Sequence, residues 1–171
     1  MAKLRDWPAK HFRIIWEQPD GSVWVTVPGR PPFPDEDDSR YLAAVAAKAQ
    51  LKIRALANAR HVSAVHKSTL PQSRRFRNCW RVLSENVHID VALVRVQILD
   101  EIRTERNSRL QASDGDLLRV NEDGMPQDII AWRDYRKQLR DLPPRVESDL
   151  AALTTPEAIE QYQPPWPNRP G

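Results

Sequence analysis

The sequence predicts an α+β fold: an N-terminal β-hairpin region packed with a helix, then an antiparallel helical hairpin, then a proline-rich tail. Three observations predict it. Two runs of β-branched and aromatic residues flank a Pro-Asp-Gly turn near the start of the chain. An alanine-rich stretch follows, and then two long amphipathic stretches. We therefore expect three regions, at 1–89 with a proline-rich connector at 28–38, at 90–146 (the helical hairpin), and at 147–171.

The first element is a hairpin over 12–27, in which "FRIIW" and "VWVTV" have strand composition and "QPDGS" forms the turn. Trp16 and Trp24 are expected to pair across it. Because an isolated hairpin is marginal in water, this one should pack on a helix or on another chain.

Helical composition follows the connector. "RYLAAVAAKAQLKIRALANA" is rich in alanine and predicts a helix from Arg40 to about Ala59, with Ser39 as its N-cap. The weak alternation of "HVSAVH", at 61–66, predicts a short strand.

The segment "LPQSRRFRNCWR", at 70–81, is the most basic part of the chain, with arginines around two aromatic residues: Arg74, Arg75, Phe76, Arg77, Trp80 and Arg81. From Arg40 to Asp90 there are ten basic and two acidic residues, a charge of +8, whereas from Val91 onward there are eleven basic and fourteen acidic residues, a charge of −3. The basic half can bind phosphate, an acidic partner, or the acidic half of its own chain or of a neighbouring copy.

The helical hairpin is predicted from two apolar faces. Asp90 can cap a helix whose apolar arc comprises Val91, Val94, Ile98, Leu99, Ile102 and Leu110. Arg95, Arg106 and Arg109 project from this arc, so they must extend to solvent, pair with carboxylates or contact a partner. Two glycine-containing turns are expected within 112–128, and Asp134 or Asp141 of the second helix could then pair with one of these arginines.

The second helix is predicted from "AWRDYRKQLRDLP", at 131–143, and its apolar face comprises Ile129, Trp132, Tyr135, Leu139 and Leu142. Arg133, Arg136 and Arg140 form a stripe along the edge of that face. Leu142-Pro143-Pro144 should end the helix, because proline lacks an N–H group. The residues leave two interpretations: a solvated helix face, or a helix whose arginines recognise another chain.

After the prolines, "RVESDLAALTTPEAIEQY" predicts one or two short helices, with Thr155 as N-cap and Pro156 at the first helical position. The closing "QPPWPNRPG" has four prolines in nine residues and is not expected to join a packed element. Trp166 is therefore either packed against the body of the protein or presented to a partner.

Motifs for catalysis, cofactors and metals are not found: the sequence has no phosphate-binding glycine-rich loop, no Gly-x-Ser-x-Gly and no metal-binding spacing of Cys and His. Cys79 is the single cysteine, and beside Trp80 it is expected to be a small packed residue. No apolar run approaches the roughly 20 residues of a membrane span, and the first residues lack a signal-peptide core. We expect a soluble, cytoplasmically made protein that has no cofactor, does not bind membranes and is not an enzyme.

The stretch "RTERNSRLQASDGDLLRVNEDGMPQDIIAWRDYRKQLRDLPPRV", at 103–146, resembles the small C-terminal module of bacteriophage tail assembly chaperone and tail-fibre assembly proteins. The matching residues are Arg103, Arg106, Leu110, Ser113, Asp114, Trp132, Tyr135, Arg136 and 139–143. The closing "PPWPNRP" looks like the Trp-Pro ending of that module. One departure is Gly115-Asp116-Leu117, where an aromatic residue often follows the acidic loop.

The preceding residues, about 70–103, are similar to a pattern in uncharacterised proteins of phage and prophage tail-gene clusters, in which a Leu-Pro, an Arg-Phe-Arg and a Trp precede a helix that opens on Asp. Together the two resemblances imply a non-enzymatic protein that binds a phage tail or tail-fibre protein. It would act in the host cytoplasm during assembly, as a chaperone, or in the virion tail, as a structural component. Whether it forms a homo-oligomer is left open.

The resemblance also selects residues for partner binding or for a shared structural core: Arg103, Arg106, Trp132, Tyr135, Arg136, Leu139, Arg140 and Asp141. The alternative function is a nucleic-acid-binding module in which the arginines of 74–81 contact phosphate while Phe76 and Trp80 stack on bases. A net charge of only +3 and the absence of a recognised motif argue against it, so nucleic acid is not the expected partner.

Overall fold

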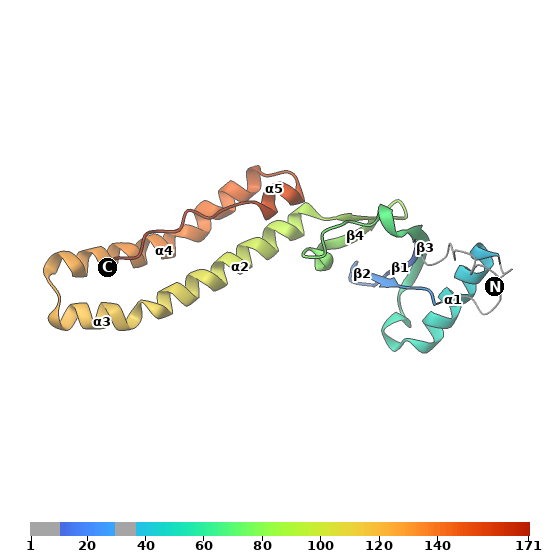
Figure 1. Cartoon of the computed structure of the whole chain (residues 1–171), viewed down its shortest axis with the longest axis horizontal. Coiled ribbons are helices and arrows are strands. Elements are labelled where there is room, and N and C mark those ends of the chain that lie inside the picture. The colour runs from blue at the N-terminus through green and yellow to red at the C-terminus, as the bar shows by residue number, and fades with distance from the viewer. Residues whose placement is uncertain (1–10, 30–36) are drawn as a thin grey trace, which may run out of the picture. The chain divides into compact units, whose positions relative to one another are not determined.

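The computed structural model describes residues 11–29 and 37–171. The chain divides into two compact units, Met1–Asp90 and Val91–Gly171, which are described one after the other (Figure 1). The first contains antiparallel sheets and a helix, and the second is helical, so the predicted α+β class is confirmed. Most of the predicted connector lies outside the described residues, and so do the first ten residues, where no signal-peptide core is expected.

The main sheet of the first unit consists of β1 (Phe12–Glu17), β2 (Val23–Thr26) and β3 (Arg60–His66), in the order β2-β1-β3 with both pairs antiparallel. The predicted hairpin is confirmed, and Trp16 lies opposite Trp24 in its register. The short strand predicted at 61–66 is also confirmed, as β3.

Helix α1 (Asp38–Lys52) differs from the prediction at both ends. Its N-cap is Asp37, whose carboxylate accepts a hydrogen bond from the Ser39 N–H at 3.1 Å, so the predicted cap at Ser39 is wrong. A carboxylate at this position also interacts favourably with the helix dipole. The helix stops before Ile53, which is extended, and the chain then returns to the sheet, so the predicted end near Ala59 is too late.

Strand β1 is covered on both faces. On one face Ile14 and Trp16 pack with buried residues of α1 and the turns after it: Tyr41, Leu42, Ala46, Ala49, Leu56 and Ala59. On the other face Ile15 and Val23 pack with Trp80 and Val87 of a second hairpin. Successive side chains of a strand point to opposite faces, so this strand is buried as a continuous apolar run.

The second hairpin, β4 (Trp80–Leu83) and β5 (Asn86–Ile89), was not predicted. Its turn residues, Ser84 and Glu85, have φ angles of 49° and 66°, in the left-handed region. Tight hairpins require such angles, which favour Asn-Gly or Asp-Gly, and neither pair is present here. The remaining short elements are 3₁₀ turns at Arg54–Leu56, Lys67–Thr69 and Arg77–Cys79.

The second unit is an antiparallel helical hairpin, as predicted (Figure 1). Helix α2 (Val91–Ala112) packs against α4 (Pro126–Ala152), and α3 (Asp114–Asp123) and α5 (Pro156–Glu160) complete the unit. The chain reverses at Gly124, where a Cβ atom would lie 2.4 Å from the Val120 carbonyl oxygen. None of the described helices is long and apolar enough to cross a membrane.

The first of the two predicted glycine turns is wrong, because Asp114 to Asp116 are the first turn of α3. Acidic residues are favourable at the N-terminus of a helix, which explains how a sequence with turn composition is helical here. The inward side chains of α3, Leu117 and Val120, pack against α4.

The predicted end of the second helix at Leu142 is also wrong, since α4 continues through Pro143 and Pro144 to Ala152. An interior proline costs roughly 3 kcal/mol because a hydrogen bond is lost. The buried residues nevertheless continue at helical spacing across the prolines, through Leu142, Val146 and Leu150. Their burial offsets this cost, at about 1.5–3 kcal/mol for each large apolar side chain. After α4, Thr155 caps α5 as predicted, accepting a hydrogen bond from the Ala158 N–H.

Candidate functional site

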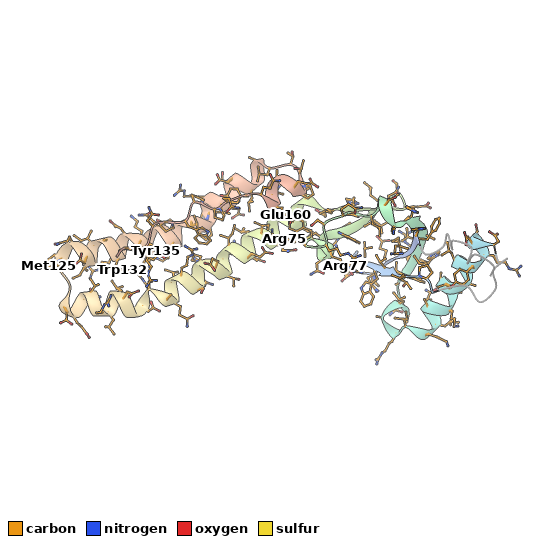
Figure 2. The ribbon with its side chains drawn as sticks, viewed as in Figure 1. Arg75, Arg77, Met125, Trp132, Tyr135 and Glu160 are labelled. Atoms are coloured by element: carbon orange, nitrogen blue, oxygen red, sulfur yellow. The ribbon has the colours of Figure 1, made fainter. Side chains whose placement is uncertain are left out.

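The aromatic residues of the phage-like pattern form a buried cluster at the α3 end of the hairpin. Trp132, Tyr135 and Leu139 are 2%, 5% and 0% exposed. The two aromatic rings meet edge to face, with centroids 5.8 Å apart, and both are labelled in Figure 2. Leu110, Leu117, Val120 and Trp166 pack around them. These three predicted site residues therefore belong to the core and are not available to a partner in this conformation.

Arg136 connects α4 to the junction between α2 and α3. Its Nη1 donates hydrogen bonds to the Leu110 carbonyl oxygen at 2.9 Å, to Ser113 Oγ at 2.6 Å and to Asp114 Oδ1 at 2.6 Å. The Arg136 side chain is 19% exposed, and Ser113 is a buried polar residue, 1% exposed. The Leu110 carbonyl oxygen also accepts from the Ser113 N–H at 3.1 Å and from Ser113 Oγ at 2.7 Å. Arg136 thus adds a charged donor from α4 to a hydrogen-bond network that already closes the end of α2.

Three of the other charged residues of the predicted site, Arg103, Arg140 and Asp141, lie on the surface. Arg140 and Asp141 are exposed, and Arg103 forms an exposed ion pair with Asp100, three residues earlier on α2. Arg106 is half-buried, and its Nε has no hydrogen-bond partner among the described residues. The structure therefore brings together only part of the predicted set.

The predicted ion pair of Asp134 or Asp141 with a buried-face arginine is wrong: neither carboxylate forms an ion pair with any described residue, and both are exposed. Two of these arginines, Arg95 and Arg109, have other partners. Arg95 donates to the Leu153 carbonyl oxygen, and Arg109 pairs with Glu105 at 2.8 Å. Main-chain carbonyls and neighbours on the same helix replace the expected contacts between helices.

The C-terminal tail, defined here as residues 163–171, packs against the hairpin. In Figure 1 the red segment after α5 runs back beside α4 and ends near the turn between α3 and α4. The Arg109 guanidinium lies 4.3 Å from the centroid of the Trp166 ring. Arg169 donates to Asp116 and lies 5.6 Å from the centroid of the Trp132 ring. Of the two alternatives for Trp166, packing against the body is confirmed, and residues 163–171 form no helix or strand, as expected.

Nothing in the sequence pattern pairs Asp116 with Arg169. The only sequence signal for these two residues is a Trp followed three residues later by an Arg in a proline-rich segment, together with an acidic residue near the hairpin turn. No periodicity connects residues so far apart in the chain.

A second polar contact holds the start of the tail. The Tyr162 hydroxyl donates to Asp149 Oδ2 at 2.7 Å. Burial, and then the hydrogen bond to this carboxylate, raise the pKa of Tyr162 to about 12. Both effects favour the neutral phenol, which is the form that can donate.

In the basic segment of the first unit, most of the arginines are exposed but the aromatic rings are buried, whereas the nucleic-acid hypothesis requires both to be exposed. Phe76 and Trp80 are 0% and 4% exposed, so their rings are not available to stack on bases in this conformation, as the alternative function would require. The guanidinium groups of Arg75 and Arg77 lie 5.4 and 5.7 Å from the Phe76 and Trp80 ring centroids. Arg74, Arg75 and Arg77 are exposed, whereas Arg81 is half-buried and donates to the carbonyl oxygens of Asn78 and Trp80.

The described residues contain no group of three or more His, Cys, Asp or Glu side chains that could hold a metal ion. No protein-family model, curated protein or solved structure matches the chain. The likeness to the phage module therefore depends on the residues quoted from the sequence.

Proposed function

We propose that this protein binds a bacteriophage tail or tail-fibre protein without performing catalysis. It would do so as an assembly chaperone in the host cytoplasm or as a structural component of the virion tail. The proposal combines the sequence resemblance with the way the matching residues are distributed over the second unit.

The observation that carries the proposal is that the matching residues divide into a supporting set and an exposed set. Trp132, Tyr135 and Leu139 are buried, and Arg136 fastens their helix to the α2–α3 junction. Arg140 and Asp141 belong to the same short motif but are exposed on α4. Solvated charges contribute about 0–1 kcal/mol per pair to the stability of the fold. Stability alone therefore does not require an arginine at position 140 and an aspartate at position 141. A rigid helix that carries exposed, directional charges is suited to protein recognition.

The test is co-expression of the chain with the tail proteins encoded beside it, followed by purification through a tag on the chain. We expect a tail protein to co-purify, and we expect Arg140→Ala with Asp141→Ala to reduce its recovery while leaving the melting temperature unchanged. Lys137→Ala with Gln138→Ala is the matched control, since both residues are exposed on the same helix. If the wild-type chain retains no tail protein, or if the control pair reduces recovery as much, the proposal is wrong.

A second experiment separates the two forms of the proposal. Mass spectrometry of purified virions detects the chain if it is a structural component and does not if it acts only during assembly. Detection at a stoichiometry matching a tail protein would identify the structural form.

Nucleic-acid binding is the competing function, and the burial of Phe76 and Trp80 weakens it. The exposed Arg74, Arg75 and Arg77 could still contact phosphate. We expect no retention of DNA or RNA in a filter-binding assay at physiological salt. Binding that falls steeply with salt, and that is lost in Arg74→Ala with Arg77→Ala, would favour this function over tail-protein binding.

A further inference from the structure

Side chains hold the C-terminal tail in place. The tail contains four prolines, which have no N–H group to donate, and its one backbone hydrogen bond among the described residues joins the Trp166 N–H to the Pro164 carbonyl oxygen within the tail itself. No strand pairing or helix attaches the tail to the rest of the described unit. Such a segment can leave its position without breaking secondary structure.

Two side chains of the tail, Trp166 and Arg169, make its contacts with the helices, and we call them the anchors. Trp166 lies against Arg109 and the apolar cluster around Trp132, and Arg169 lies between Asp116 and the Trp132 ring. Proline-rich segments favour the polyproline II helix, which has three residues per turn and so places residues i and i+3 on the same side. The spacing of Trp166 and Arg169 matches this repeat.

The surface that receives the tail is assembled from three helices. Arg109 comes from α2, Asp116 from α3 and Trp132 from α4, and we call these residues the tail-docking face. Its two charged residues contact different anchors: the Arg109 guanidinium stacks on the Trp166 ring, and the Asp116 carboxylate accepts a hydrogen bond from Arg169. With the tail in place Trp132 is 2% exposed, so departure of the tail would uncover aromatic surface.

We propose that the tail-docking face also accepts the tail of a second copy of this chain, so that two copies associate by exchanging tails. The same side-chain contacts form within one copy and between copies. What separates the two states is therefore mainly the effective concentration of the tail beside its own face, which is in the millimolar range for short flexible connections. Exchange of an identical segment is a low-cost route to a symmetric dimer. A high local concentration of the protein favours the exchanged dimer, and so does the loss of a chain's contacts with its own tail.

A complementation experiment with two full-length variants tests the exchange. The first, Trp166→Ala with Arg169→Ala, has an intact face and no anchors. The second, Arg109→Ala with Asp116→Ala, has an intact tail and a damaged face. We expect each variant alone to be monomeric and an equimolar mixture to form a one-to-one complex, detected by native mass spectrometry and by light scattering after gel filtration. Two folded variants that stay monomeric when mixed would overturn the proposal.

A peptide assay covers the case in which the face variant fails to fold. The probe is a fluorescently labelled peptide of residues 161–171, added to full-length Trp166→Ala with Arg169→Ala. We expect it to bind this variant about tenfold more tightly than the wild-type chain, whose own tail competes. The matched control is the same peptide with alanine at both anchors, which should bind about tenfold more weakly. Equal binding of the two peptides, or no binding, would show that the face does not accept a tail from another molecule.

Discussion

Replacement of Arg136 by lysine should destabilise the second unit, although the positive charge is preserved. The lysine side chain ends one covalent bond short of Nη1, roughly 1.5 Å, so its ammonium group would not reach the three acceptors on the α2–α3 junction without movement of α4. A hydrogen bond from a charged donor contributes about 1.5–3 kcal/mol. The Asp114 part of the contact adds only about 0–1 kcal/mol, because that carboxylate is 63% exposed.

We therefore expect Arg136→Lys to lower the free energy of unfolding by about 1.5–3 kcal/mol. For a unit of this size, this corresponds to a fall of about 6–24 °C in melting temperature. Far-ultraviolet circular dichroism during heating is a suitable assay, since the second unit contributes most of the helix. Arg140→Lys, one turn further along α4 and exposed, is the matched control and should stay within about 0.5 kcal/mol of wild type.

A double-mutant cycle adds a stricter requirement. Ser113→Ala removes the buried hydroxyl that accepts from Arg136, so its effect should be smaller when lysine already occupies position 136. Equal melting temperatures for Arg136→Lys and Arg140→Lys, or additive effects of Ser113→Ala and Arg136→Lys, would contradict the structural role of Arg136.

Three further predictions concern other contacts. Leu139→Ala should destabilise the second unit by about 2–5 kcal/mol, because Leu139 is fully buried; Leu118→Ala, at a 61% exposed position, should have little effect in the same denaturant titration. Glu85→Gly should stabilise the first unit by about 0.5–1 kcal/mol, because φ is 66° there, and a lower midpoint of denaturation would contradict this. The Tyr162 contact stabilises the fold fully below about pH 10 and is lost as the pH rises toward 12, since its folded-state pKa is raised. Asp149→Asn should move this pKa down toward the ordinary value of tyrosine, which the ultraviolet absorbance of phenolate measures.

The elements that the sequence predicts well are those in which local pattern and packing agree. The strand composition around the Pro-Asp-Gly turn predicts β1 and β2, and the apolar spacing of Trp132, Tyr135 and Leu139 predicts the buried face of α4. In each case the periodicity that forms the element also supplies its buried side.

The errors have a common physical origin, which is long-range packing that overrides a local signal. Pro143 and Pro144 are strong helix terminators, yet α4 continues because the residues beyond them are buried against the rest of the unit. Ser84 and Glu85 lack the composition of a tight turn, but the hairpin they connect covers one face of β1. Local propensity is a weak guide where tertiary contacts compensate for it.

The candidate site was predictable in part for the same reason. The short motif on α4 identified Arg136, whose contacts to a main-chain carbonyl, a hydroxyl and a carboxylate depend on the distant α2–α3 junction. The tail contacts could not be predicted from the sequence, because Arg169 and Asp116 are far apart in the chain and belong to segments with no shared repeat.

The burial of β1 on both faces has a consequence for the order in which the protein is synthesised. Phe12–Glu17 leaves the ribosome before α1 and before the β4–β5 hairpin, which is complete only at Ile89. At about 5–20 residues per second, the face that contains Ile15 remains without its cover for roughly 4–14 s. During that interval the nascent chain carries an apolar strand that chaperones, or neighbouring nascent chains, can bind.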